Sequence, residues 1–138
     1  MALTLEIVTP ELRALTVQCD EVRLPGSEGG FGVRAGHTPF MTLLKAGELV
    51  YVTGGVAGIG QDNRYAIGEG FCEVSNDRVR VLAEEAFRAD ALDAAAIEKE
   101  LAERKAKMAA LPPGDASFDL ERAKLERVAA RLDVARGR

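Results

Sequence analysis

Hydrophobic and polar positions alternate in short runs along the first part of the chain. In the run 3–9, Leu3, Leu5 and Ile7 alternate with polar residues, and further runs typical of strands follow at 47–55, 65–67, 71–74 and 79–82. A period of two is typical of β-strands with one buried face. Because these runs are separated by glycine and by Asn or Asp, the pattern predicts an antiparallel β-sandwich or barrel.

The breaks between these runs predict turns. Asn76 and Asp77 tolerate positive φ and predict a tight hairpin between two strands. The alternation shifts phase at Glu21–Val22, which predicts a bulge or a short turn. The stretch from Gly30 to Leu49 is rich in Gly and Pro, so we interpret the part around His37 as an ordered loop.

After Ala89 the pattern changes to that of helices. Residues 90–111 contain neither Gly nor Pro, and we expect Asp90 to be the N-cap of a helix. A Pro-Pro-Gly-Asp turn at 112–115 then separates this helix from a second one, running from its expected N-cap Ser117 to Val134. Apolar residues recur at helical spacing on both segments: Ile97, Leu101, Met108 and Leu111 on the first, and Phe118, Leu125, Val128 and Leu132 on the second.

The helix pair offers little apolar side-chain area, because much of its stripe is alanine. Each alanine buries far less than the ~1.5–3 kcal/mol of a large aliphatic side chain. We therefore expect an antiparallel helical hairpin that is only marginally stable by itself and needs the β-domain or a partner to cover it. Such an element is suited to move.

Charge and composition exclude several classes of function. The formal net charge is −4 and acidic and basic residues are interleaved, so no basic face for nucleic acid is expected. No stretch approaches the ~20 apolar residues of a membrane span, and the N-terminus lacks the features of a signal peptide. These features predict a soluble, cytoplasmic protein. Cys19 and Cys72 are interpreted as buried free thiols, with a disulfide between them left open.

The sequence contains few residues or motifs that are typical of a catalytic site. His37 is the single histidine, and neither a nucleophile elbow nor a phosphate-binding glycine loop occurs. The glycines at 54–60 are interpreted as turn or bulge residues. A Cys72–His37 nucleophile pair would need chance convergence in space, and Glu84-Glu85 is interpreted as the solvated end of a strand. We expect no metal and no enzymatic activity of the chain itself.

Three segments carry a resemblance to a known family. The opening LTLEIVTPEL, the segment LPGSEGGFGVRAGHTPFMTLLKAGEL and the segment AIGEGFCEVSNDRVRVLAEEAFRADALD are similar, in that order, to the epsilon subunit of the bacterial F-type ATP synthase, called delta in mitochondria. The resemblance covers essentially the whole chain. It implies an α+β fold: a flattened antiparallel β-sandwich of about ten strands at residues 1–86, followed by a two-helix antiparallel hairpin at 87–138.

The resemblance also implies a function. Members are non-catalytic rotor subunits at the cytoplasmic face of the bacterial plasma membrane, where the sandwich contacts the gamma subunit and the c-ring loops. The hairpin can rise along gamma towards the catalytic beta and alpha subunits and inhibit ATP hydrolysis. The alternative from another class is a free-standing β-sandwich adaptor or ligand-binding module with a helical tail.

Three residues are implied as c-ring contacts. His37 matches the histidine of the family's Gly-His-x-Pro turn, and Arg34 adds a charge beside it. Gly30 stands where members often carry an acid. The implied role of this segment is contact, with the flanking glycines and Pro39 setting the shape of the loop.

The second helix carries the other implied sites. Lys124, Arg127 and Arg131 share one helical face, which is ordinarily solvated and which the resemblance directs towards acidic residues of beta. Some members bind ATP in the folded hairpin through an Ile/Leu-Asp-x-x-Arg-Ala motif and two arginines of the second helix. Leu92, Asp93, Arg127 and Arg131 match that set, but Ala96 and Ile97 replace the motif's Arg-Ala, and Phe87 replaces an acid. No cofactor is therefore expected.

Overall fold

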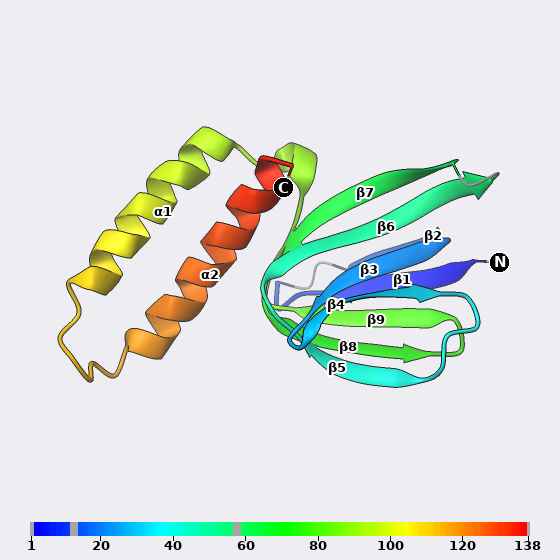
Figure 1. Cartoon of the computed structure of the whole chain (residues 1–138), viewed down its shortest axis with the longest axis horizontal. Coiled ribbons are helices and arrows are strands. Elements are labelled where there is room, and N and C mark those ends of the chain that lie inside the picture. Colours follow the sequence, from blue (N-terminus) through cyan, green and yellow to red (C-terminus); the bar gives the residue numbers. More distant parts are fainter. Residues whose placement is uncertain (1, 12–13, 57–58, 138) are drawn as a thin grey trace.

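The computed structural model describes residues 2–11, 14–56 and 59–137. Within these residues the chain forms ten strands, a 3₁₀ turn and two helices (Figure 1). The elements are β1 (Leu3–Val8), β2 (Ala14–Cys19), β3 (Glu21–Gly26), β4 (Gly29–Arg34), β5 (Phe40–Leu44), β6 (Gly47–Val56), β7 (Ile59–Ile67), β8 (Gly70–Ser75), β9 (Arg78–Ala83), β10 (Ala86–Arg88), η1 (Ala89–Ala91), α1 (Ala94–Ala109) and α2 (Phe118–Ala135).

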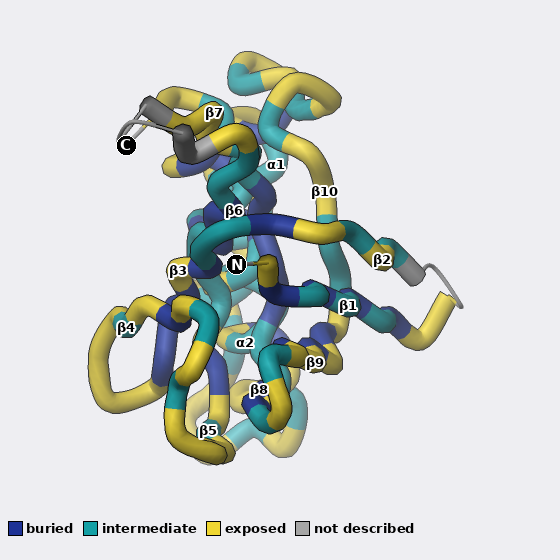
Figure 2. Tube along the Cα trace, turned by 90° about the vertical axis from the view of Figure 1, so that its right-hand side faces the viewer, coloured by how far each residue is buried: buried dark blue, intermediate teal, exposed yellow. Residues whose placement is uncertain are grey.

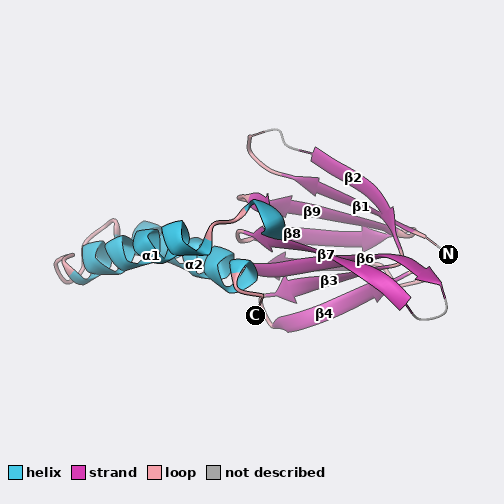
Figure 3. Cartoon of the chain, turned by 90° about the horizontal axis from the view of Figure 1, so that it is seen from above, coloured by secondary structure: helices cyan, strands magenta, loops and turns pink. Residues whose placement is uncertain are grey.

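The strands form one curled sheet in the order β10-β7-β6-β3-β5-β8-β9-β1-β2, with β4 paired to β3. The sheet folds over itself at β3, which pairs with β6 along its first half and meets β5 through Gly26–Leu44. Figure 3 shows the two layers that result, with the helices extending from one end. The expected α+β fold is confirmed. One strand pair differs from the antiparallel expectation, because β1 and β9 run parallel.

The core lies between these two layers. In β9, buried and exposed residues alternate strictly, as the sequence pattern predicts. Leu3, Leu5 and Ile7 of β1 are each at most 2% exposed. The remaining large side chains of this core come from seven other strands: Val22, Leu24, Val33, Leu44, Leu49, Tyr51, Tyr65, Ile67, Val74, Val79 and Val81.

His37 lies in a loop, as interpreted, but most of the stretch from Gly30 to Leu49 around that loop is β-structure. It contains β4 and β5, and only residues 35–39 connect them. β4 pairs with β3 along its whole length, and Val33 faces the core from it. Hairpin pairing with the preceding strand β3 and burial of alternate residues therefore override the poor strand propensity of Gly29, Gly30 and Gly32.

The expected turns are present. Asn76 and Asp77 have φ of 50° and 58° and join β8 to β9, as predicted. The sequence predicted either a bulge or a short turn near Glu21. The structure has the short turn, which joins β2 to β3. The predicted boundary after residue 86 falls inside β10, which pairs with β7 through Phe87–Ala66, so the sheet continues to Arg88.

The first helix begins later than predicted. Asp93, and not Asp90, is its N-cap: the Asp93 carboxylate accepts hydrogen bonds from the backbone N–H of Ala95 and Ala96, at 3.1 and 3.3 Å. Asp90 lies in η1 and binds the guanidinium of Arg88. Residues 89–91 complete only one 3₁₀ turn, since Leu92 is again extended.

The second helix begins where predicted, after Ser117. The Ser117 side chain does not cap the helix, however. Its hydroxyl donates to the carboxylate of Asp115 at 2.6 Å, and its backbone N–H donates to the same oxygen at 2.8 Å. Asp115 therefore fixes the turn that precedes α2.

The two helices form the expected antiparallel hairpin, and α2 lies between α1 and the sheet (Figure 1). The hairpin has its own small core of Ile97, Val128 and Leu132, supported by partly buried Leu92, Ala94, Leu101 and Ala135. This core is separate from that of the sheet. In the described part of the chain, neither helix is long and apolar enough to span a bilayer.

Candidate functional site

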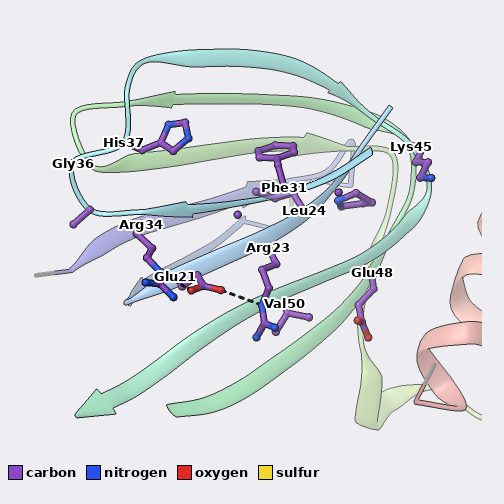
Figure 4. Close-up of a pocket in the computed structure, with 14 residues that line it drawn as sticks. Glu21, Arg23, Leu24, Phe31, Arg34, Gly36, His37, Lys45, Glu48 and Val50 are labelled. Carbon is purple, nitrogen blue, oxygen red and sulfur yellow. Dashed lines mark hydrogen bonds and ion pairs between the residues drawn. The ribbon is translucent and has the colours of Figure 1, made fainter. Parts of the chain in front are cut away.

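A cleft of about 890 Å³ opens where β3, β4 and β6 meet the β4–β5 loop (Figure 4). Its side chains come mainly from those elements and from the β5–β6 turn. The polar ones are Glu21, Arg23, Arg34, His37, Lys45 and Glu48, and the apolar ones are Leu24, Pro25, Phe31 and Val50. The cleft therefore combines an apolar part with charges of both signs.

The structure brings the three residues Gly30, Arg34 and His37 together at this cleft. Gly30 and Arg34 lie near the two ends of β4, and His37 lies in the loop that follows. A Cβ atom on Gly30 would meet only the carbonyl oxygen of Leu24, at 3.6 Å, so a side chain fits there without displacing any backbone. The absence of an acid at position 30 is thus not imposed by packing.

The charges beside the cleft are linked to one another. Arg34 Nε lies 2.7 Å from an oxygen of Glu21, and the Arg34 side chain is 80% exposed. Glu21 also lies 3.2 Å from Arg23, which reaches Asp62 of β7 at the same distance. These exposed ion pairs contribute little to stability, but they hold the cations in place at the surface.

The loop that carries His37 is tied to the β8–β9 turn. Gly36, with φ of +84°, donates its backbone N–H to the carboxylate of Asp77 at 2.6 Å. His37 Nδ1 lies 2.6 Å from the carbonyl oxygen of Thr38. A carbonyl only accepts, so Nδ1 is the donor in this contact. The imidazole lies edge-on to Phe40, with ring centres 6.1 Å apart.

Cys72 does not form a nucleophilic pair with this histidine. Its side chain is fully buried in the sheet core, and burial raises the pKa of the Cys72 thiol to about 12. Burial likewise raises the pKa of Cys19 to about 11. Thiols of this kind are inert at neutral pH, and both cysteines are free, as interpreted from the sequence.

An exposed row of apolar side chains, which the sequence analysis missed, crosses four strands. Leu43 of β5 pairs with Phe71 of β8, Phe71 pairs with Leu82 of β9, and Leu82 pairs with Val8 of β1. Because directly paired residues point to the same face, these four residues form one continuous strip, the apolar row. Leu43 is 63% and Leu82 45% exposed. The exposed stretches of β5 are visible in Figure 2.

The basic face of α2 is occupied rather than solvated. Arg127 binds the carboxylate of Glu69 with two hydrogen bonds of 2.8 Å each. Arg131 lies between Glu85 and Glu100, at 3.0 and 3.4 Å, and Lys124 lies 3.6 Å from Glu121. The interpretation of Glu85 as a solvated strand end is therefore wrong, because its side chain is only 22% exposed against Arg131.

Glu121 was not singled out in the sequence, although it is a buried charge inside the hairpin. Its carboxylate lies 3.3 Å from Lys107 and 3.5 Å from Arg104 of α1. Burial raises the pKa of Glu121, but the Lys107 hydrogen bond and the charges of Lys107, Lys124 and Arg104 outweigh it, so the net pKa is lowered. The carboxylate stays ionised and joins α2 to α1 near the connecting turn.

The four residues that match the ATP motif are each engaged elsewhere. Leu92 packs against the hairpin core and Asp93 caps α1. Arg127 and Arg131 bind glutamates of the sheet and of α1. Phosphate oxygens would therefore have to displace carboxylates from both arginines. Among the described residues, no cluster of three or more potential metal ligands occurs.

Comparison with known proteins identifies the family. Residues 2–89 match the family model described as "ATP synthase, Delta/Epsilon chain, beta-sandwich domain". The chain is 48% identical over 135 residues to the ATP synthase epsilon chain of Anaeromyxobacter sp. (strain K), covering 98% of both chains. It is 43% identical over 133 residues to that of Myxococcus xanthus (strain DK1622), covering 96% of this chain and 94% of the relative.

Two solved structures share the fold. One is a chain of the Euglena gracilis mitochondrial ATP synthase, with a TM-score of 0.76 at 24% identity, covering 94% of this chain and 78% of that one. The other belongs to the central stalk and c-ring of the Tetrahymena thermophila enzyme, with a TM-score of 0.58 at 11% identity, covering 98% and 97%. At these identities the likeness concerns the fold alone.

Proposed function

Because this chain belongs to the ATP synthase epsilon-chain family, we propose that it is a rotor subunit that couples the c-ring to gamma and to the catalytic head. Epsilon chains are non-catalytic subunits of the synthase, and this chain matches them over both its sheet and its hairpin. That full-length match is the observation that carries the proposal. The membrane is reached through the complex, and we place the chain at the cytoplasmic face of the bacterial plasma membrane.

The cleft is our candidate for contact with the c-ring loops. Arg34 and His37 supply a cation and an imidazole at its rim, beside a loop held in shape by the Gly36–Asp77 hydrogen bond. Polar loops of a neighbouring subunit are suited to such a surface, since exposed polar contacts specify register at modest free energy. Gly30 adds open surface at the place where, by the family resemblance, members often carry an acid.

The apolar row is our candidate for contact with gamma. Met41 extends the same face of β5, where it is 61% exposed. A contiguous apolar surface of this kind is costly in an isolated protein and typical of a permanent subunit interface. It lies on β1, β5, β8 and β9, whereas α2 packs on β6 and β7, so the hairpin leaves the row uncovered.

The hairpin is our candidate for the inhibitory element. In the raised position, Lys124, Arg127 and Arg131 would meet acidic residues of beta. In the docked position described here, all three bind carboxylates of this same chain. The small hairpin core supports the idea that the two positions differ by only a few kcal/mol, which partners are able to reverse.

The experiment that tests the proposal is a binding titration with purified gamma. A rotor subunit is expected to bind gamma at equal stoichiometry and to co-purify with it. Leu43→Glu and Leu82→Glu, which place a charge in the apolar row, should weaken that complex. Thr53→Glu, which adds the same charge at a partly exposed position of β6, is the matched control. Folded protein without affinity for gamma would instead support a free-standing adaptor.

A further inference from the structure

Two turns at one end of the sheet form an acidic surface beneath α2. Glu69 lies between β7 and β8, and Glu85 between β9 and β10. The turns are bonded to each other: Gly68 N–H donates to the Glu85 carbonyl at 2.9 Å, and Glu84 N–H donates to the Glu69 carbonyl at 3.0 Å. We call the carboxylates of Glu69 and Glu85 the acidic cradle. Its backbone belongs to the sheet and does not depend on the hairpin.

Arg127 binds the cradle with good geometry. Its Nε and Nη2 each lie 2.8 Å from one oxygen of Glu69, which is the parallel two-bond arrangement that guanidinium and carboxylate favour. The Arg127 side chain is only 18% exposed. The hydrogen bond from Arg127 lowers the pKa of Glu69, against the opposing effect of burial, so this carboxylate stays ionised.

Arg131 binds the cradle less well. Its Nε lies 3.0 Å from Glu85, but the N–H does not point at the carboxylate, and this buried nitrogen makes no hydrogen bond within the described residues. The guanidinium also reaches Glu100 of α1 at 3.4 Å and lies 5.6 Å from the centre of the Phe87 ring. A buried N–H without a hydrogen bond lowers the stability of the docked position. The charge of Glu85 therefore attracts Arg131, but Arg131 separates from Glu85 more easily than Arg127 separates from Glu69.

The rest of the docking face is small. Arg127, Ala130, Arg131 and Val134 lie at i, i+3, i+4 and i+7 on one side of α2. Ala130 and Val134 are buried, yet they add only one methyl and one isopropyl group. The apolar contact is too small to hold α2 firmly, so the two arginines decide whether the hairpin docks.

We propose that the acidic cradle is an internal docking site that holds the hairpin down by occupying Arg127 and Arg131. Docking of the hairpin then requires no nucleotide, because the sheet itself supplies the anions. An acidic partner surface recruits the hairpin only by competing with Glu69 and Glu85 for these arginines. The docking site concerns the isolated chain, and only its consequence for inhibition rests on the proposed function.

Hydrogen exchange of the isolated full-length protein tests this docking site. The readout is the exchange rate of α2 amides relative to that of β9 amides. Neutralising the cradle with E69Q/E85Q should raise this ratio roughly tenfold, because two charge-assisted contacts are lost. The matched control E73Q/E103Q neutralises one exposed glutamate on β8 and one on α1, and should leave the ratio unchanged.

Exchanging the charges of Arg127 and Glu69 provides a second test of the docking site. R127E should raise the ratio, and combining it with E69R should restore most of the protection by reversing the pair. High salt should loosen α2 in the wild type and have little further effect in E69Q/E85Q. The docking site is refuted if E69Q/E85Q matches the wild type, if α2 and β9 loosen equally, or if the exchange restores nothing. None of these results bears on binding to gamma.

Discussion

The β-domain and the helical hairpin are built on opposite balances of apolar and charged contacts. The sheet encloses a continuous core to which nine of its strands contribute large or medium apolar side chains, with Leu5 and Val79 fully buried. The hairpin encloses only Ile97, Val128 and Leu132, and it meets the sheet through Arg127 and Arg131. Apolar burial is strong and non-directional, whereas ion pairs near the surface are weak and exchangeable.

This difference suits the two regions to the separate tasks proposed above. A deep core keeps the cleft and the apolar row in fixed positions, which a permanent subunit interface requires. A thin core with a charged docking face suits an element that, as proposed above, changes partner at small cost in free energy. Glu121 links α2 to α1 within the hairpin, so we expect the two helices to stay together if the hairpin leaves the sheet.

The largest expected effect comes from the sheet core. Leu5→Ala should lower the free energy of unfolding of the β-domain by about 3 kcal/mol, because a fully buried leucine leaves a cavity between the layers. Ile97→Ala, in the hairpin core, should loosen α1 and α2 while leaving the unfolding of the sheet nearly unchanged. Urea unfolding followed by hydrogen exchange separates the two. Equal loss of sheet stability in both variants would mean that the regions form one cooperative unit.

Removal of the hairpin is the next test. A fragment ending at residue 89 retains β10, and it should fold, bind gamma and melt within roughly 5 °C of the full chain, because the docking face adds little apolar area. In the assembled synthase the same truncation should raise ATP hydrolysis while assembly survives. Calorimetry and a hydrolysis assay measure these outcomes. An unfolded fragment would show that the hairpin is part of the sheet's stability.

The sequence predicts most of the regular elements in both regions, and its misses fall in both. Alternation in 3–9 and 79–82 identified two core strands, and the absence of Gly and Pro in 90–111 identified the first helix. The strands β4 and β5 were missed for different reasons: glycines conceal the alternation of β4, and β5 pairs with β8, which is distant in the chain. Asp90 and Asp93 are both suitable N-caps by residue type, so the sequence did not distinguish them. The path of the chain after β10 makes Asp93 the N-cap.

The docking contacts were beyond sequence reasoning for a physical reason. Arg127 and Glu69 are 58 residues apart, and no periodicity connects them. Their meeting depends on how the hairpin is placed against the sheet. The basic face of α2 was recognised, but its partners were assigned outside the chain. Gly30, Arg34 and His37 do meet at one cleft, and their roles in contact remain predictions.

Nucleotide binding tests whether the hairpin needs an outside anion. The arginine of the motif is replaced by Ala96, which removes a charge-assisted contact of roughly 1.5–3 kcal/mol. Glutamates also hold Arg127 and Arg131. We expect ATP to bind the isolated protein at about millimolar concentration or more weakly. Calorimetry gives the affinity, and micromolar binding would show that other residues complete the site.

Charge reversal on α2 should give a smaller functional effect than truncation. Changing Lys124, Arg127 and Arg131 to glutamate should raise ATP hydrolysis by the assembled synthase part of the way to the truncated level. Each contact lies near the surface, so each should contribute about 1 kcal/mol and weaken with salt. Reversing Lys99, Lys105 and Arg122, which are exposed elsewhere on the hairpin, is the control. Equal hydrolysis rates for intact, truncated and reversed forms would show that the hairpin does not inhibit.

The smallest expected effect concerns His37 in the rigid region. His37→Ala should leave the β-domain folded, because its ring contacts the exposed Phe40 and the neighbouring Thr38 carbonyl and is not part of the sheet core. Loss of one polar contact at a partly exposed interface costs about 1 kcal/mol, so coupling between proton flow and ATP turnover should weaken only modestly. Thr38→Ala, in the same loop, is the control for local disturbance. Proton pumping and hydrolysis measured on the same membranes give the coupling ratio. Complete loss of hydrolysis would assign His37 a catalytic role and overturn its assignment as a contact residue, whereas an unchanged ratio would place the c-ring contact elsewhere on the sheet.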